Sequence, residues 1–278
     1  MTASEVHSTA PDELDDGLEY EVDLVSDNEG NPVSDGEIEG LEGDDTIDLE
    51  AKTSKKRNKN SSFREKKKMK MELDMKKKKD LSLEESTEII SDYFNNKIQK
   101  NYPDLSALEL TEKYFTKSEI RSTFEFKDPR TLDNLSKFIE TKFKNMLPTK
   151  KMLSKKSTET SEEKKFIAIV SMSAIRACDT HRATKELGGG SIKLINKNKI
   201  DADLKIVGST HSRILCCTPS RLIKVLDHPD LKLTKDQIKI IIVDNSYLDT
   251  KQQNIWDVDH SAQLLKDLTK SGSKLYLY

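Results

Sequence analysis

Short apolar runs alternate with helical patterns over the second half of the chain. The runs are FIAIVSM at 166–172, IKLI at 192–195, RILCC at 213–217, IKIIIVD at 238–244 and KLYLY at 274–278. Because these runs are continuously apolar, they predict strands buried on both faces. The spacing predicts helices between them at 174–187, 219–226 and 258–270. Strands that alternate with helices indicate an α/β fold, with a parallel sheet and helices on both faces.

A helical preface is expected before this sheet, starting near Leu81. Ser82 followed by Glu85 is a capping-box pattern, and the apolar positions that follow recur at helical spacing up to Pro103. These apolar positions are Ile89, Ile90, Tyr93, Phe94 and Ile98. The pattern predicts an amphipathic helix.

Two more helices are expected in the preface. A short one is predicted over 106–110, and Asp128–Pro129 is predicted to open a longer one that ends before Pro148. Residues 111–127 fit extended and helical structure equally well. The polar stretch 149–165 is predicted to be a flexible linker between the helical extension (81–148) and the sheet domain (166–278).

The amino-terminal segment 1–50 is strongly acidic, with 18 Asp and Glu residues and no Lys or Arg. Its few large apolar residues follow no helical or strand period, and we expect a disordered tail. Ser26 and Ser34 each precede a carboxylate by three residues, which is the spacing that acidophilic kinases accept. Phosphorylation there is predicted to deepen the negative charge.

The next segment, 51–80, is basic, with 14 Lys and Arg residues against 4 acidic ones. Its clusters comprise Lys55, Lys56, Arg57, Lys66, Lys67, Lys68, Lys76, Lys77, Lys78 and Lys79. Flexible cations of this density are typical of nuclear localisation signals and of arms that bind nucleic acid. A solvated, charged helix is the alternative. The net charge of −2 hides this division between an acidic and a basic block.

Several classes of function are disfavoured by composition. The sequence has no apolar stretch long enough to span a membrane and no apolar secretory segment near its start, so a soluble intracellular protein is expected. Cys178, Cys216 and Cys217 form no Cys-x-x-Cys pair and are predicted to be buried thiols. The scattered histidines show no metal-ligand spacing, so no metal, cofactor or small-molecule substrate is expected.

Four segments of the sheet domain resemble, in order, motifs of the first RecA-like domain of DEAD-box RNA helicases. They are AIRA at 174–177, the glycine run 188–190, TPSR at 218–221 and VDNS at 243–246. The resemblance implies a degenerate RecA-like fold of the P-loop NTPase type. The chain lacks the Gly-x-x-x-x-Gly-Lys phosphate loop, and Asn245 stands where the family has its catalytic glutamate. We therefore expect no ATPase activity and no enzyme.

Without ATPase activity, the resemblance still implies a role in binding RNA. In the helicases the double-glycine and Thr-Pro-Gly-Arg loops touch the nucleic-acid backbone. In addition, a helix that starts after Thr218 offers amide groups to phosphate. The candidate RNA-binding residues are Arg176, Gly189, Gly190, Thr218 and Arg221. The alternative is that Thr218 only caps a helix and the glycines only end one.

Nearly the whole chain resembles the Cms-one family, which is associated with the small-subunit processome, or 90S pre-ribosome. The most specific segments are YPDLSALEL at 102–110, VSMSAIRACDTHR at 170–182 and CTPSRL at 217–222. The resemblance implies a nucleolar protein that joins pre-ribosomal RNA and processome proteins. Two other interpretations remain open: a protein-interaction adaptor in DNA replication or chromatin without RNA contact, and a nucleotide-binding enzyme with a divergent loop at 188–191.

Overall fold

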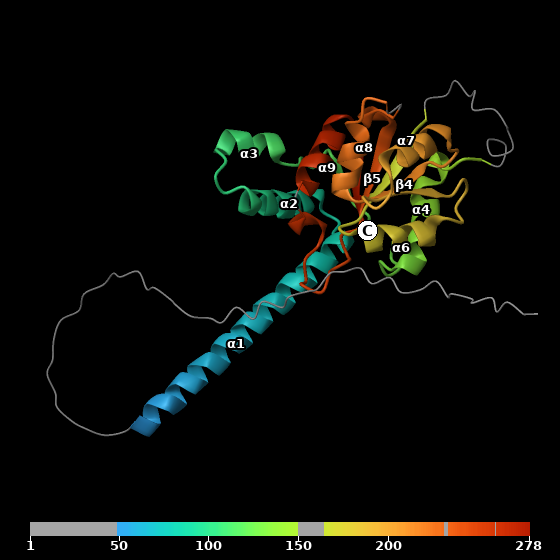
Figure 1. Cartoon of the computed structure of the whole chain (residues 1–278). Helices are drawn as coiled ribbons and strands as arrows, with labels where there is room; N and C mark the ends of the chain where they lie inside the picture. Colours follow the sequence, from blue (N-terminus) through green and yellow to red (C-terminus); the bar gives the residue numbers. More distant parts are fainter. Residues whose placement is uncertain (1–48, 150–163, 231–232, 259) are drawn as a thin grey trace, which may run out of the picture. The chain divides into compact units, whose positions relative to one another are not determined.

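One sheet of six parallel strands organises the part of the chain that this computed structural model describes, which is 49–149, 164–230, 233–258 and 260–278 (Figure 1). The strands are β1 (Ile120–Arg121), β2 (Phe166–Val170), β3 (Ser191–Leu194), β4 (Ile214–Cys217), β5 (Ile238–Val243) and β6 (Lys274–Leu277). Their order is β1-β6-β5-β2-β4-β3. The expected parallel α/β sheet is confirmed, and its topology is consistent with a RecA-like domain.

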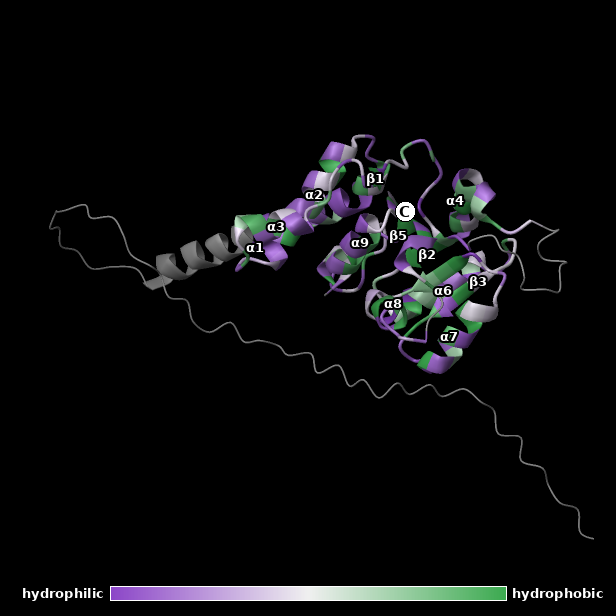
Figure 2. Cartoon of the chain, turned by 90° about the horizontal axis from the view of Figure 1, so that it is seen from above, coloured by the Kyte–Doolittle hydropathy of each residue, from purple (hydrophilic) through white to green (hydrophobic). Residues whose placement is uncertain are grey.

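Side chains of each central strand alternate between two cores. Ile167 and Ile169 of β2 point into one core, and Ala168 and Val170 point into the other. Helices α4 (Leu132–Phe143) and α6 (Ala174–Thr184) cover the first face, and α7 (Ile200–Ser209), α8 (Pro219–Leu226) and α9 (Ser261–Lys270) cover the second (Figure 1). Figure 2 shows the apolar strands in green between these layers. Burial of each fully buried Ile side chain stabilises the folded state by roughly 1.5–3 kcal/mol.

The amphipathic helix expected after Leu81 is confirmed as α2 (Thr87–Asn101). Its buried face includes Phe94, whose ring stacks on Trp256 with centroids 3.8 Å apart. The short helix is also confirmed, as α3 (Ala107–Lys113), with a complete capping box between Ser106 and Glu109. This packing fixes α2 and α3 onto the second face of the sheet domain.

The predicted capping box at Ser82 and Glu85 is wrong. Helix α2 is capped by Ser86, whose hydroxyl accepts a hydrogen bond from the backbone N–H of Ile89. Ser82 is buried, and its hydroxyl donates to the carbonyl oxygen of Lys79 instead. The Ser-x-x-Glu pattern at Ser82 is a false signal, because several polar residues precede the apolar residues of α2 and more than one of them fits the capping pattern.

Strand β1 and helix α7 were not predicted, and helices α4 and α9 begin later than expected, α9 at Ser261 rather than at 258. Strand β1 lies inside the ambiguous segment 111–127, and its two residues are too few to show a period. Helix α7 was missed because its sequence, IDADLKIVGS, mixes charged residues with only one fully buried apolar position, Val207. Helix α4 begins at Leu132 rather than at Asp128–Pro129, because Pro129 belongs to a turn in which its carbonyl oxygen accepts from Thr131 N–H.

Ordered structure begins well before Leu81, contrary to expectation. The basic segment lies in helix α1 (Leu49–Asp80), 32 residues long, so the charged-helix alternative describes it and the flexible arm does not. At 1.5 Å per residue the helix is about 48 Å long. Among the described residues, no helix combines the length and apolar character needed to cross a membrane.

Several sequence-based predictions fall outside the described residues. These are the acidic tail over 1–48 with Ser26 and Ser34, and most of the linker, 150–163. In α1, side chains are described from Arg64 onward, so the first basic cluster at 55–57 has a helical backbone only. Cys216 and Cys217 are buried and Cys178 is half-buried, and none of the three forms a disulfide.

The half-buried ring of His181 on α6 is expected to make stability sensitive to pH. Its Nδ1 lies 2.8 Å from Ser191 Oγ, and burial, with Lys193 nearby, lowers the pKa of His181. The fold therefore favours the neutral ring, and this contribution is present above the unfolded pKa of about 6.5 and is lost as pH falls through it. Urea unfolding should show a steeper fall between about pH 7 and 5 for the natural chain than for His181→Gln. Identical curves would contradict the assignment; His228→Gln is the control.

Candidate nucleic-acid interface

A buried ion pair occupies the edge of the sheet where β2 and β5 end, which we call the carboxyl edge. Asp244 follows β5, and Arg176 lies in the first turn of α6, after β2. Arg176 Nε is 2.7 Å from Asp244 Oδ2, and Arg176 NH2 is 3.1 Å from Oδ1. Burial opposes the charge of the guanidinium, but the bonds to Asp244 outweigh it and raise the pKa of Arg176. The one acid retained from the helicase motif is therefore neutralised internally.

The amide of Asn245 joins helix α1 to the same edge. Asn245 Nδ2 donates to the carbonyl oxygen of Lys78 over 2.8 Å, and its Oδ1 accepts from Trp256 Nε1 over 2.9 Å. The side chain is fully buried. These contacts need one donor and one acceptor at the same position, which an amide has and a carboxylate does not. Both the donor and the acceptor of the Asn245 side chain are therefore used within the fold.

Lys78 is the one buried cation of the basic clusters among the side chains described. Its Nζ donates to Gln252 O over 2.7 Å and lies 3.1 Å from Asp74 and 3.2 Å from Asp257. Burial would raise the pKa of Asp257, but Lys97 and Lys78 lower it overall. Lys78 was predicted to belong to the basic arm. In the structure its ammonium group instead bonds the last turn of α1 to Gln252 and Asp257.

Asn245→Asp is expected to loosen this junction. The carboxylate has no donor for the Lys78 carbonyl oxygen, and a buried group left without its partner costs about 1–3 kcal/mol. We expect a lower free energy of unfolding and faster trypsin cleavage within α1. Asn196→Asp, on an exposed loop, is the matched control. Unchanged stability and cleavage would show that Asn245 does not hold α1.

The turn between β1 and α4 has the strand-to-helix position at which P-loops bind phosphate. In this chain it is filled by its own side chains. Arg130 donates to the carbonyl oxygens of Thr123, over 2.7 Å, and Ser82, over 3.3 Å. Its guanidinium lies over the rings of Phe126 and Tyr278, 4.8 and 5.8 Å from their centroids. The turn is thus packed by an internal cation.

Arg221 is likewise committed to an internal partner. Its Nε lies 2.8 Å from Asp203 Oδ2, and its NH2 donates to Asn198 O over 2.8 Å. Both charged side chains are buried. Thr218 is the N-cap residue of α8, as expected, but its side chain makes no capping bond. RNA contact by Thr218 and Arg221 stays a prediction. That prediction needs a free guanidinium on Arg221, whereas in this structure the group is bonded to Asp203 and Asn198.

The glycine run shapes the turn from α6 into β3. Gly189 and Gly190 have φ values of 80° and 66°, which favour glycine, and a Cβ on Gly189 would lie 2.8 Å from Pro148 Cγ. Because this turn precedes a strand of a parallel sheet, it lies at the edge opposite Arg176 and Thr218, which follow strands. Gly189 and Gly190 therefore lie at the opposite edge of the sheet from the other three candidates.

The loop after β3 lies beside the start of α8, next to Thr218, and the sequence analysis did not predict this contact. Asn196 Nδ2 donates to Ser220 Oγ over 3.2 Å, across the two loops. Lys197 and Lys199 are exposed in the same loop. Cations that follow a strand could have signalled this position, since the ends of neighbouring parallel strands meet at one edge.

Exposed cations gather on α1 instead. Those of the predicted clusters that are exposed are Lys66, Lys67, Lys68, Lys76, Lys77 and Lys79. Lys68 lies 3.9 Å from Glu72, and both side chains are largely exposed, so this pair contributes little. These ammonium groups are accessible to phosphate, unlike the two arginines at the carboxyl edge.

Comparison with known proteins identifies the family. The model of the CMS1 family, described as U3-containing 90S pre-ribosomal complex subunit, matches residues 43–274, which is most of the chain. The chain belongs to this family. The match runs through α1, the helical extension and the sheet domain. The family resemblance inferred from the sequence is confirmed.

Two similar proteins come from yeasts. Protein CMS1 of Saccharomyces cerevisiae is 32% identical over 69% of this chain, and protein cms1 of Schizosaccharomyces pombe is 31% identical over 96% of it. The match covers 94% of the S. pombe protein but only 65% of the S. cerevisiae protein, which is less than two thirds of its length. The family description places these proteins in ribosome biogenesis.

Proposed function

We propose that this chain is a non-enzymatic assembly factor of the 90S pre-ribosome, that it acts in the nucleolus, and that it binds pre-ribosomal RNA mainly through α1. One observation supports this most: side chains at the carboxyl edge are bonded within the fold, whereas the α1 lysines described after Arg64, apart from Lys78, are exposed. Membership of the CMS1 family supports the assignment to the 90S pre-ribosome.

Binding through α1 is expected to depend on charge rather than on base sequence. Lysine ammonium groups on an exposed helix match phosphates as point charges, and phosphate contacts carry no sequence information. Each contact releases counterions, so affinity should fall steeply with salt. The acidic tail, which lies outside the described residues, is proposed to attract basic partners such as ribosomal proteins.

Absence of ATP turnover is part of the proposal. The bidentate bond from Arg176 occupies both oxygens of Asp244, and Arg130 fills the turn after β1. Asn245 is an amide, which cannot act as the general base that orients a water. These contacts support a sheet domain that serves as a rigid support for α1 and for protein partners.

Crosslinking of the full chain in cells, followed by sequencing of the attached RNA, tests the proposal. We expect pre-ribosomal spacer RNA to be enriched, with crosslinked peptides from α1. Absence of this RNA, together with retention in a protein complex, would contradict the proposal and favour the adaptor in DNA replication or chromatin.

A further inference from the structure

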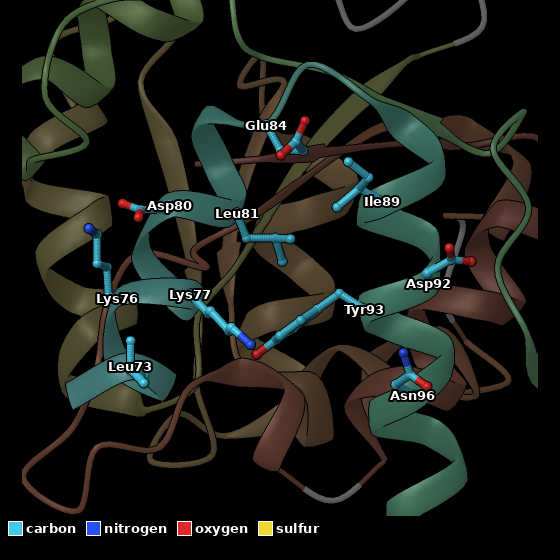
Figure 3. Close-up of a pocket in the computed structure, with 10 residues that line it drawn as sticks. All are labelled: Leu73, Lys76, Lys77, Asp80, Leu81, Glu84, Ile89, Asp92, Tyr93 and Asn96. Atoms are coloured by element: carbon cyan, nitrogen blue, oxygen red, sulfur yellow. The ribbon is translucent and has the colours of Figure 1, made fainter. Parts of the chain in front are cut away.

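A groove lies between the last turns of α1 and the first half of α2, which we call the α1–α2 groove (Figure 3). Its volume is about 590 Å³. Leu81 is buried at its floor, and Tyr93 extends from α2 toward α1 across it (Figure 3). The groove lies outside the carboxyl-edge contacts, and of the exposed α1 lysines named above only Lys76 and Lys77 line it.

Apolar side chains face solvent on both walls of the groove. Leu73 on α1 is 55% exposed and Ile89 on α2 is 53% exposed. Ile89 belongs to the apolar period of α2, but the fold leaves it uncovered while it buries Ile90 and Phe94. Full burial of one such side chain is favourable by roughly 1.5–3 kcal/mol, so a partner that covers both gains substantially.

Charges of both signs line the groove. Lys76, Lys77 and Asp80 lie on the α1 wall, Glu84 lies in the segment between the two helices, and Asp92 lies on the α2 wall. Within the described part of the chain, Lys76, Lys77 and Asp92 form no ion pair. A ligand that fits must therefore present an apolar stripe, with acidic groups toward Lys76 and Lys77 and a basic group toward Asp92. A helix with apolar residues three and four positions apart has this shape and charge order.

We propose that the α1–α2 groove is a docking site for an amphipathic helix of another protein, with acidic residues on one flank of its apolar stripe and basic residues on the other. Nucleic acid is a poor occupant, because phosphate would be repelled by Asp92 and would leave Leu73 and Ile89 uncovered. The two surfaces of α1 thus have different tasks: its outer lysines face RNA, and the groove face holds a protein.

A photo-crosslinking amino acid at position 73 or 89 tests the occupant directly, in 90S particles purified from cells that express the full chain. Both positions are expected to crosslink to the same peptide of one partner, with the predicted apolar stripe and charged flanks. Leu108 on α3 and Ile206 on α7, 77% and 47% exposed, are control positions that should not yield this peptide. Crosslinks from 73 and 89 to RNA, to a second copy, to residues 1–48 or to nothing above the controls would overturn the proposal.

The double variant Leu73→Glu, Ile89→Glu gives an independent readout. Because both side chains are exposed, its unfolding curve should match that of the natural chain, and its RNA affinity in isolation should change far less than its retention in the particle. We expect retention to fall at least about tenfold, as two lost apolar contacts predict. The control, Leu108→Glu, should be retained. Equal retention of both variants would overturn the groove assignment without affecting the RNA-binding proposal.

Discussion

Arg221→Ala is expected to lower the free energy of unfolding by about 3–5 kcal/mol, because it leaves the carboxylate of Asp203 buried without its cation. Asp203 is 1% exposed, and its carboxylate also accepts a hydrogen bond from the amide of Asn198 over 2.9 Å. The loss is a large fraction of the 5–15 kcal/mol that is typical of a folded domain. Urea or thermal unfolding of the purified chain measures it.

A matched variant separates the ion pair from RNA contact. Replacing both partners, Arg221→Met with Asp203→Leu, removes the unpaired charge and should restore much of the stability. If Arg221 is structural, the RNA affinity of this double variant should equal that of the natural chain. A stable double variant with strongly weakened RNA binding would show that Arg221 contacts RNA despite its burial.

Substituting four exposed lysines of α1 by glutamine is expected to weaken RNA binding on the order of 100-fold at about 0.1 M salt and to lower the salt slope by about 3. The positions are Lys66, Lys67, Lys70 and Lys79, all of which lie outside the groove residues. Glutamine keeps the helical propensity, so α1 should persist. Fluorescence anisotropy with a labelled pre-ribosomal RNA fragment, over a range of salt, measures both effects.

The control removes the same number of charges elsewhere. Lys144, Lys185, Lys205 and Lys270 are exposed at sites away from α1 and the carboxyl edge. Their substitution by glutamine should change affinity only a few-fold, through the net charge. An equal loss in both variants would mean that binding follows net charge and that α1 has no special part in it.

The strands were predictable because burial on both faces leaves a continuous apolar run. All five predicted runs became strands, and Pro219 and Leu226 were correct as the limits of α8. Strand β1 gave no signal, since its place is fixed by pairing with β6, more than 150 residues later. The helical state of α1 was left open, because its charged residues show neither an apolar stripe nor a breaker.

The candidate site was less predictable than the fold. Arg176 and Arg221 are recognisable as motif residues, but a sequence does not show that each faces a buried carboxylate from another element. The pairing of Asn245 with Lys78 joins residues 167 positions apart. The glycine run matched a motif by composition, yet only the strand boundaries show that it lies at the opposite edge of the sheet. Local pattern fixes elements, whereas contacts between distant elements decide which side chains remain free.

RNA-stimulated ATP hydrolysis is the most direct measurement of whether this member of the CMS1 family works without turnover. The purified full chain is incubated with ATP, Mg²⁺ and enough pre-ribosomal RNA to saturate binding, and released phosphate is followed. We predict phosphate release no faster than without protein, while anisotropy reports bound RNA in the same sample. A rate that rises with RNA and is lost in Asp244→Asn would contradict the account.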